Sequence, residues 1–384
     1  MMDVQCLSPV TKQQILAALA PFARPSNSRG LCIFLFEYAL YYGCLGVILF
    51  TPLLSVKIAA SLVAGVKLSA FTTLGHDAAH KTLVANRKMN RWLAVLLFIP
   101  CMHNYRLWIW DHHEVHHFET NGDHFDSYTP YSKQEFDCLP WYRQWFERLI
   151  RSRSFVGFGI HYLFQRMISV RIYPQAAVPA RHRASAWRHF AALTIYHVLL
   201  IAILLAAPSI APVSAAEALL LGFALPLFMF ACLTGGSLYL MHTHPSIPWF
   251  KGEFDRRGAG AVELCSTHLS LPRLVSRLVH NVFAHSAHHA HPGVPSYRLL
   301  EAQAALDALL GDSAVSEPMR LSRVLYTLRV CKLYDFERHQ WQDFNGVPTT
   351  SPLNIARPVA PGTRAASDLL VAGRSDFTSC ETCI

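Results

Sequence analysis

The sequence predicts an all-α, polytopic membrane protein, and three observations support this class. The chain is rich in apolar residues, it holds four long apolar runs, and its histidines gather beside those runs. Of 384 residues, 52% are apolar and only 15% are charged, whereas about a quarter are charged in soluble domains. The mean hydropathy is +0.24. These values exclude a disordered chain and argue against an ordinary soluble enzyme.

Four apolar runs are long enough to cross a bilayer as helices. In order, they cover about 31–52, 56–74, 189–208 and 216–240. They form two hairpins with short turns. Lys67 lies inside the second run, where a charge is costly unless it snorkels or faces the protein interior. Two weaker stretches, 93–102 and 155–168, are expected to be interfacial or re-entrant rather than spanning.

Basic residues set the expected orientation and the division of the chain. The segment between the second and third runs is rich in Lys and Arg, whereas the hairpin turns hold only Lys57. This bias places the segment and both termini on the cytoplasmic side, and a bacterial inner membrane is favoured over the endoplasmic reticulum. The expected parts are a cytoplasmic N-terminal segment over 1–30, a membrane domain over 31–345 and a disordered tail over 346–384.

Charge and cysteine content exclude two other classes. The formal net charge is +9, but Lys and Arg form no cluster with a reading element, so no nucleic-acid partner is expected. The 10 Cys are scattered, which argues against a disulfide scaffold and favours a reduced compartment.

Three histidine clusters carry the functional argument in a chain that holds 21 His. They are His76-Asp77-Ala78-Ala79-His80, then His113-x-x-His116-His117, then His285-x-x-His288-His289. On a helix, positions i, i+3 and i+4 project to one side, so each cluster can direct its imidazoles at one metal centre. At this histidine frequency about 0.06 chance matches to HxxHH are expected, and two occur.

The two runs between the second and third clusters bring all three clusters to the same side of the membrane. Eight imidazoles exceed the four positions of one tetrahedral zinc, so we expect two metal ions that share the ligands. The candidate ligands are His76, His80, His113, His116, His117, His285, His288 and His289. Asp77 is the candidate to accept a hydrogen bond from the far ring nitrogen of a ligand.

Other polar residues near the clusters are not expected to bind metal. Glu114, Asp123 and Asp126 are interpreted as solvated loop residues, and His112 and His291 adjoin the clusters but fall outside their registers. The remaining histidines are interpreted as structural: His103, His124, His161, His182, His189, His197, His268 and His339.

The order HDxxH, HxxHH, HxxHH resembles the integral-membrane fatty acid desaturases, and the resemblance covers roughly 30–340. Further stretches are similar to the acyl-lipid, Δ12-type branch. They are Tyr239-Leu240-Met241-His242-Thr243-His244-Pro245, His280-Asn281-Val282 before the third cluster, and Val294-Pro295-Ser296-Tyr297 after it. The first cluster has three residues between its histidines, whereas acyl-CoA desaturases typically have four.

The resemblance implies two non-haem iron ions held by the eight histidines, with no catalytic residue separate from the metal ligands. It implies that O2 and two electrons place a cis double bond in the acyl chain of a membrane lipid. The electrons would come from a separate donor of ferredoxin or cytochrome b5 type. A ninth ligand usually lies at the end of the fourth span, where His242 and His244 compete, although both can also belong to an interfacial turn before Pro245.

Alternatives stay open at this stage. The clusters alone also allow a carotenoid ketolase or hydroxylase, or a fatty acyl hydroxylase. An intramembrane zinc protease would require a glutamate where Asp77 stands, and a metal transporter would place its ligands at mid-membrane depth.

A basic stretch follows the second cluster and alternates with aromatic residues. Its members are Arg143, Arg148, Arg151 and Arg153, with Trp141, Trp145 and Phe146. We interpret it as an interfacial helix that touches anionic lipid headgroups, and a docking surface for an acidic electron carrier is the alternative.

Overall fold

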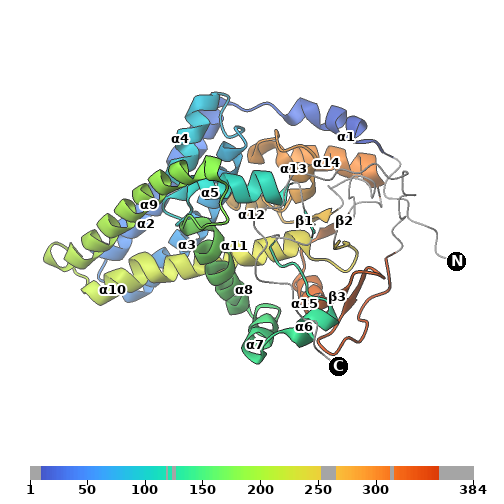
Figure 1. Ribbon diagram of the computed structural model, residues 1–384. Coiled ribbons are helices and arrows are strands. Elements are labelled where there is room, and N and C mark those ends of the chain that lie inside the picture. Colours follow the sequence, from blue (N-terminus) through green and yellow to red (C-terminus); the bar gives the residue numbers. More distant parts are fainter. Residues whose placement is uncertain (1–9, 118–119, 123–126, 252–264, 312–314, 354–384) are drawn as a thin grey trace.

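Long helices form an elongated bundle, and shorter helices cover one end of it (Figure 1). The computed structural model describes residues 10–117, 120–122, 127–251, 265–311 and 315–353. Asp123, His124 and Asp126, together with most of the expected C-terminal tail, lie outside the described residues. The protein is mostly helical, as predicted.

Four segments are long and apolar enough to cross a membrane, which confirms the four expected spans. They are α2 (Asn27–Phe50), α3 (Leu54–Ala79), α9 (Ala180–Ala206) continued by η4 (Ala207–Ser209), and a last segment built from α10 (Ala215–Leu219), η5 (Leu220–Ala224) and α11 (Leu225–His242). The third begins at Ala180 rather than near 189, because helix-forming polar residues after Pro179 extend it beyond its apolar part.

The lysines inside the spans are paired with carboxylates. Lys67 faces the protein interior, where its Nζ lies 2.9 Å from Oε2 of Glu37 on α2. His280 lies against the other oxygen of that carboxylate, at 3.2 Å. Near the opposite end of α3, Nζ of Lys57 lies 3.1 Å from Oε1 of Glu217. Because both lysines find an acidic partner, the spans carry them without an isolated buried charge.

The segment between the second and third spans forms short helices. They are α4 (Arg87–Phe98), α5 (Tyr105–Ile109), η2 (Trp110–His116), α6 (Lys133–Cys138), α7 (Trp141–Ile150), α8 (Phe155–His161) and η3 (Tyr162–Ile172). The helix α8 packs directly on α11. A side chain at Gly235 would meet the carbonyl oxygen of Phe158 at 2.4 Å, so this close approach requires glycine.

The cap consists of segments from both ends of the chain. It comprises α1 (Lys12–Leu19), η1 (Ala20–Phe22), β1 (Thr267–Ser270), α12 (Arg273–Leu278), α13 (His285–Ala290), η7 (Ser296–Arg298), α14 (Leu299–Leu310), β2 (Val315–Pro318), α15 (Leu321–Val330), β3 (Leu333–Asp335) and β4 (Gln340–Gln342). Strands β1 and β2 pair in parallel, and β3 and β4 pair antiparallel. The sequence did not predict these strands, because three or four residues are too few to show a period of two.

Both expected terminal segments have ordered parts within the cap. Ile15 and Leu19 of α1 are buried and pack in one apolar cluster with Ala287 of α13. The N-terminal segment therefore contacts the helix that carries the third histidine cluster.

The sequence assigned residues 346–384 to the tail, but residues 347–353 lie along β4, where the amide of Thr349 donates to the carbonyl of Trp341 at 2.9 Å.

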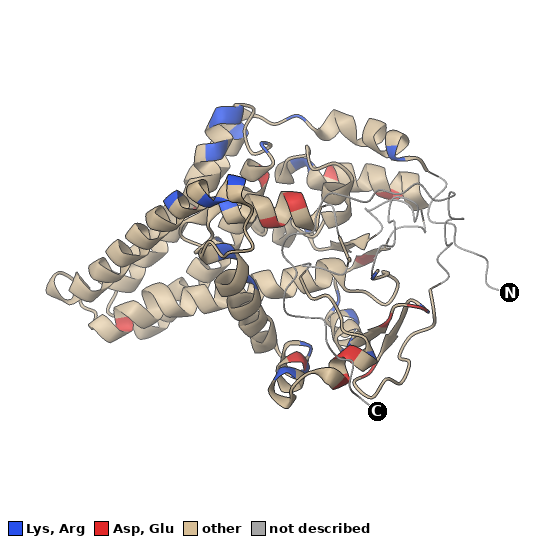
Figure 2. Ribbon diagram, viewed as in Figure 1, with Lys and Arg blue, Asp and Glu red and all other residues tan. Residues whose placement is uncertain are grey.

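Charge is distributed unevenly over the molecule. Lys and Arg gather around α4, α5 and the cap, whereas the opposite tip, where α2 turns into α3 and α9 turns toward α10, carries few charged residues (Figure 2). The two turns at that tip, 51–53 and 210–214, contain no charged residue. This asymmetry is the structural counterpart of the Lys and Arg bias in the sequence.

The Glu37–Lys67 pair makes a testable contribution to stability. Replacing one partner leaves an uncompensated buried charge, so Glu37→Gln is expected to lower the free energy of unfolding by about 3 kcal/mol. The double variant Glu37→Gln/Lys67→Met removes both charges and should recover most of that loss. Thermal unfolding in detergent measures both, and equal losses in the single and double variants would contradict the prediction.

Candidate metal centre

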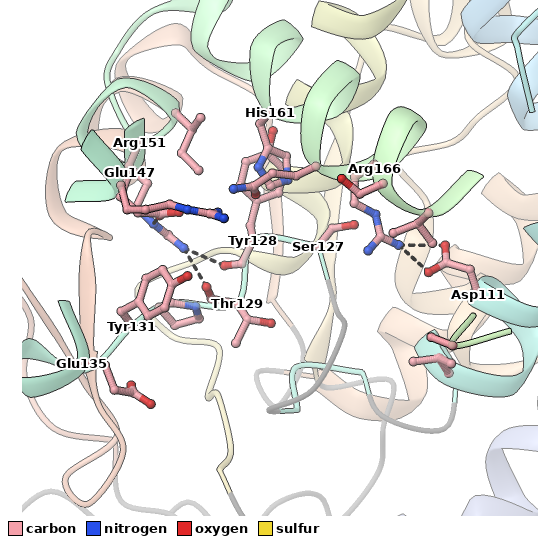
Figure 3. A pocket seen from close by; sticks show the side chains of 18 of the residues that line it. Asp111, Ser127, Tyr128, Thr129, Tyr131, Glu135, Glu147, Arg151, His161 and Arg166 are labelled. Atoms are coloured by element: carbon pink, nitrogen blue, oxygen red, sulfur yellow. Dashed lines mark hydrogen bonds and ion pairs between the residues drawn. The ribbon is translucent and has the colours of Figure 1, made fainter. Parts of the chain in front are cut away.

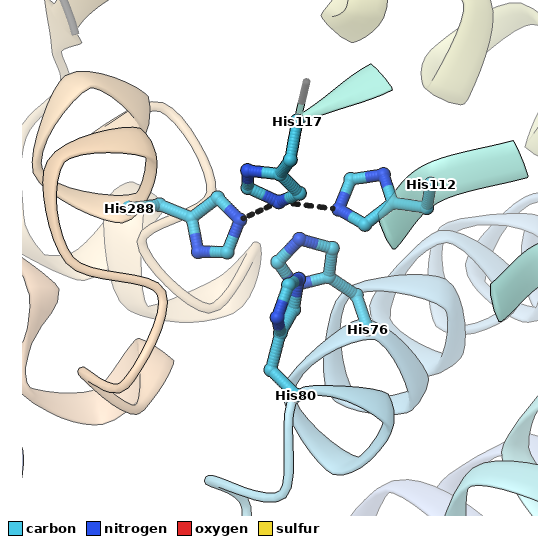
Figure 4. A group of neighbouring side chains, drawn as sticks. All are labelled: His76, His80, His112, His117 and His288. Atoms are coloured by element: carbon cyan, nitrogen blue, oxygen red, sulfur yellow. Dashed lines mark hydrogen bonds between the residues drawn. The ribbon is translucent and has the colours of Figure 1, made fainter. Parts of the chain in front are cut away.

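Nine histidine side chains converge in two groups at the cap end of the spans. The first group is His76, His80, His112, His117 and His288 (Figure 4), and the second is His116, His242, His285 and His289. Within each group, one nitrogen from every imidazole lies within 4.8 Å of the others. All four members of the second group are buried. Seven of the eight ligands expected from the sequence therefore meet in these groups, together with His112 and His242.

Regular helix geometry accounts for two of the clusters. His76 lies in the last turn of α3 and His80 caps that helix, so the two rings lie one turn apart in an edge-to-face arrangement with centroids at 4.7 Å. On α13, His285 and His289 are four residues apart and direct their Nε2 atoms to within 3.0 Å of each other. His288 projects instead toward the first group, where its ring lies 4.1 Å from that of His76.

The middle cluster departs from the expected register because η2 is a π-helix. The amide of His117 bonds to the carbonyl of His112, five residues back, at 3.1 Å. The wider turn brings His112 beside His117, with their Nε2 atoms 3.1 Å apart. His113, which the sequence favoured, lies outside both groups, although its ring centroid is 4.2 Å from that of His80. The α-helical spacing rule could not show this shift.

Contacts between ring nitrogens fit metal coordination better than hydrogen bonding. Nε2 of His285 lies 2.9 Å from Nε2 of His242 and 3.0 Å from that of His289. Two imidazole nitrogens bound about 2.1 Å from one ion are separated by roughly 3.0–3.4 Å, depending on geometry. A neutral imidazole has one N–H and one acceptor, so chains of Nε2 atoms at this distance cannot all be hydrogen bonds.

Several ring nitrogens in these clusters are buried without a hydrogen-bond partner in the described part of the chain. Among them are Nε2 of His76 and Nε2 of His80, both from the first group. Unsatisfied buried nitrogens are costly in a metal-free fold. The donor set therefore fits two imidazole-bound ions, and imidazole suits iron, zinc and copper alike.

His242 and His244 lie in different surroundings, and only His242 belongs to one of the two histidine groups. Nδ1 of His242 lies 3.2 Å from the carbonyl oxygen of Cys265, so an N–H there leaves Nε2 directed at His285. His244 lies away from both groups, and its Nδ1 accepts from the amide of Ser246 at 3.1 Å. The helix α11 ends at His242, so the backbone after it no longer directs side chains toward the site.

Asp77 links the first cluster to the segment after the third. Its Oδ2 accepts from the amide of Ser296 at 2.6 Å, at the start of η7. Its Oδ1 lies 3.5 Å from Nδ1 of His76. The buried carboxylate can thus position both the ring of His76 and the chain that leaves α13.

Burial favours the neutral form of several imidazoles outside the spans. Desolvation and the neighbouring histidines lower the pKa of His117 to about 2. The same causes hold the pKa values of His285, His288 and His289 well below the usual range. Desolvation, His76 and Lys81 lower the pKa of His113 to about 4. Neutral rings are the form that binds a metal ion.

Two buried arginines bind an aspartate of η2, an interaction that the sequence did not predict. Asp111 lies directly before His112 and accepts from Nη2 of Arg166 at 2.7 Å and from Nη2 of Arg171 at 2.8 Å. Burial alone would raise the pKa of Asp111, but the two guanidinium groups lower it below its ordinary value. Both arginines lie on η3, so this network joins the π-helices η2 and η3.

Most remaining histidines lie outside both groups and contact other partners, as the sequence predicted. His103 lies 2.8 Å from the hydroxyl of Tyr162, and His197 lies 2.9 Å from the carbonyl of Leu193. Glu114 faces away from the metal groups, with Arg181 at 2.6 Å.

The basic stretch after the second cluster is not one exposed surface. Arg151 is buried, with 1% of its side chain exposed, and its guanidinium bonds to the backbone carbonyls of Tyr128 and Thr129. The guanidinium of Arg148 stacks over the ring of Phe344 at 4.6 Å. Both the expected contact with lipid headgroups and the alternative docking surface are therefore wrong for Arg151, because this side chain is buried in the protein.

Comparison with known proteins decides the family. Residues 52–319 match the family model described as fatty acid desaturase, which covers more than half of the chain and all three histidine clusters. The chain belongs to the fatty acid desaturase family. This assignment confirms the resemblance seen in the sequence.

Three relatives illustrate where this desaturase-family chain stands. It is 25% identical over 304 residues to the chloroplastic omega-6 fatty acid desaturase of Spinacia oleracea, covering 77% of this chain and 64% of that protein. It is 23% identical over 279 residues to a sn-1 oleoyl-lipid 12-desaturase of Picosynechococcus, covering 72% and 76%. It is 25% identical over 308 residues to a sn-1 acyl-lipid omega-3 desaturase (ferredoxin) of Synechocystis, covering 79% and 82%.

The chain spans somewhat less than two thirds of the first chloroplast relatives. The matched part amounts to 64% of the spinach protein and 62% of that of Glycine max.

The two histidines at the end of α11 should differ in metal binding. His242→Ala removes a nitrogen from the second group and is expected to lower the bound metal by roughly one ion per chain. His244→Ala should leave the metal content unchanged. Metal analysis of the purified proteins measures this, and the reverse order would remove His242 from the site.

The π-helical register predicts a similar contrast on η2. His112→Ala should lower metal content because Nε2 of His112 lies among the first group. His113→Ala should have a smaller effect on metal content. If only His113→Ala loses metal, the α-helical register would be correct and the placement of His112 wrong.

Proposed function

We propose that the protein is an acyl-lipid desaturase that introduces a cis double bond into a fatty acyl chain at a di-iron centre. One observation carries the proposal: nine imidazoles converge in two groups in a chain of the fatty acid desaturase family. Two groups of nitrogen donors are what two neighbouring metal ions require. The chemistry of imidazole leaves the metal open, and family membership favours iron.

Each ion would have its own set of ligands. The first would be held by His76, His80, His112, His117 and His288, and the second by His116, His242, His285 and His289. When bound, the two irons supply the O2-dependent oxidation of an unactivated C–H bond, which no protein side chain can perform. The protein contributes ligand geometry, position and the exclusion of water.

Burial is the main contribution of this chain to such chemistry. The second group is fully buried between α11, η2 and α13, so bulk water is kept from it. The carbonyl of Cys265 and the carboxylate of Asp77 face the far ring nitrogens of His242 and His76. Fixed rings keep their donor atoms directed at the metal, which raises affinity and preserves the site during turnover.

The substrate and the electron donor follow from chemistry together with the relatives. Two of the relatives are named as acting on acyl chains carried by lipids, and one is named as using ferredoxin. We therefore infer a membrane acyl lipid as substrate. The two electrons for each turnover would come from a separate carrier of ferredoxin or cytochrome b5 type.

The metal end would face the cytoplasm of a bacterial cell. Lys and Arg gather at that end, and the opposite turns lack charge (Figure 2). By the positive-inside rule, the cap and both termini would then be cytoplasmic, where reduced electron carriers are available.

Expression in a host with a simple lipid profile tests the activity. Wild type should produce an unsaturated acyl product that the host lacks, visible by gas chromatography and mass spectrometry. His288→Ala should abolish the product with the protein still in membranes, whereas His189→Ala, outside both metal groups, should retain it. A hydroxylated or ketolated product would show a different oxygenase, and stoichiometric zinc in active protein would exclude iron.

Topology can be measured separately from activity. A reporter placed after Arg153, beyond α7, should read as cytoplasmic, and a reporter in the turn 210–214 should read as exported. Opposite readings at both positions would show that the protein lies in the membrane with the inverse orientation. Such a result would leave the metal groups intact but would place them on the wrong side for a cytoplasmic carrier.

A further inference from the structure

A cavity of about 670 Å³ lies beside the cap end of the first span, α2. Its lining comes from α2 on one side and from α12, η7 and α14 of the cap on the other. Its described lining includes none of the nine metal-group histidines, so the cavity is separate from the candidate metal centre. Its volume lies within the range of about 300 to 1,000 Å³ that is usual for ligand pockets.

Three arginines line this cavity, and none of them has an acidic partner among the described residues. They are Arg29 on α2, Arg277 on α12 and Arg298 on η7. Arg277 is exposed, and its side chain makes no hydrogen bond within the described part of the chain. Arg29 is exposed too, and its Nη2 donates to the carbonyl oxygen of Tyr297 at 3.1 Å. Its guanidinium lies over the ring of Tyr297, 4.7 Å from the ring centre, which leaves its other nitrogens available to a ligand.

The acidic residues of the lining do not neutralise these arginines. The carboxylate of Glu37 is buried and already pairs with Lys67 at 2.9 Å and with His280 at 3.2 Å. Glu301 is the other acidic residue of the lining, and it is exposed. The three arginines therefore outnumber the uncompensated carboxylate, and the excess positive charge favours an anion.

A second cavity, of about 580 Å³ behind η2, differs in this respect (Figure 3). There, Nη2 of Arg151 donates to the backbone carbonyls of Tyr128 and Thr129, at 2.9 and 3.0 Å. Nη2 of Arg166 lies 2.7 Å from the carboxylate of Asp111. Both guanidinium groups thus have acceptors inside the protein, so the cavity beside α2 is the better candidate for an anion.

An apolar surface continues from the arginines along the span. Arg29, Ile33 and Phe36 are spaced i, i+4 and i+7, so they share one face of α2, and all three line the cavity. The rise from Arg29 to Phe36 is about 10 Å along the helix axis. Phe36 is 63% exposed, and Leu274 of α12 on the opposite wall is 73% exposed. The cavity therefore has a cationic end and an apolar end, as the head group and acyl chain of a lipid require.

The cationic end lies where the membrane interface is expected. Arg29 belongs to the first turn of α2, at the start of the span. The short helix α12 carries Arg273 and Arg277 together with Leu274 and Leu278, and both leucines are more than half exposed. A helix that presents basic and large apolar side chains together is typical of the level of the lipid head groups.

We propose that this cavity binds the phosphate of an anionic phospholipid, with one acyl chain lying along α2. Phosphate oxygens would accept hydrogen bonds from the guanidinium groups of Arg29 and Arg277, and Arg298 adds a third positive charge. The acyl chain would contact Ile33 and Phe36. The proposal does not depend on the proposed function, because the site uses no metal-group histidine.

A lipid in this cavity would hold the segment that precedes α13. His280 and Asn281 belong to the lining, and Nδ2 of Asn281 donates to the carbonyl oxygen of Ser296 at 2.9 Å. This bond joins the residues before α13 to those after it. Because a ligand that binds the folded state stabilises it, added anionic lipid should raise the melting temperature.

Two substitutions test the two ends of the site. Arg277→Gln removes a guanidinium that has no partner in the described protein, so the melting temperature without lipid should stay unchanged. Binding of dioctanoyl phosphatidylglycerol should weaken about fivefold, which is the usual effect of one arginine near an anionic head group. Cys32→Trp fills the cavity from an exposed position on α2 and should weaken binding at least as much.

Each variant has a matched control on the same helix, at an exposed position outside the described lining. Arg273→Gln on α12 makes the same change of charge, and Leu35→Trp on α2 adds the same bulky ring. Both controls should bind phosphatidylglycerol within about twofold of wild type. If Arg273→Gln weakens binding as much as Arg277→Gln does, general surface charge explains the binding and the cavity site is wrong.

Calorimetric titration of the purified, metal-loaded protein in neutral detergent measures these affinities. The probes are dioctanoyl phosphatidylglycerol, a neutral galactosyl diacylglycerol of the same chain length, and inorganic phosphate. Tighter binding of phosphatidylglycerol, lost in Arg277→Gln and Cys32→Trp and kept in both controls, supports the proposal. Equal binding of the neutral lipid would overturn the assignment of an anion, and equally tight binding of inorganic phosphate would overturn that of a lipid. Because the readout is binding, the result stands whether or not an unsaturated product is formed.

Discussion

The interior of this protein is organised around nine imidazole rings, which lie within a few ångströms of one another inside each of two groups. Protonation of several rings would place like charges in a water-poor space, and burial prevents it. Such an arrangement is unfavourable without a ligand for the nitrogens. The ends of α3 and α11, together with η2 and α13, therefore place their imidazole nitrogens as bound metal ions would require.

Buried ion pairs and charged contacts fix three of these elements: α3, η2 and the segment before α13. Glu37 joins α2 to Lys67 on α3 and to His280 before α13, so the spans and the third cluster are tied through one carboxylate. Asp111 joins η2 to two arginines of η3 on the opposite side. Such pairs contribute modest net stability, because desolvation offsets much of their attraction. Their effect here is positional, since each fixes a helix that carries metal-group histidines.

The same π-helix, η2, divides two chemical environments. One side carries His112 and His116 of the metal groups, and the other borders a cavity whose lining includes Asp111, Arg151 and Arg166. The bonds from Arg166 and Arg171 to Asp111 fix the helix that carries His112 and His116.

The sequence by itself determined the four spans, the mostly helical fold and the three histidine clusters, because long apolar runs and short-range spacing are local properties. Tertiary structure decided which rings meet. The i→i+5 bond at His117 brings His112 into the first group in place of His113, and the end of α11 separates His242 from His244. It also buried Arg151, which the sequence placed in an exposed basic stretch. These outcomes depend on helix type and on distant contacts such as Asp111 with Arg166 and Arg171, and neither leaves a periodic signal in the sequence.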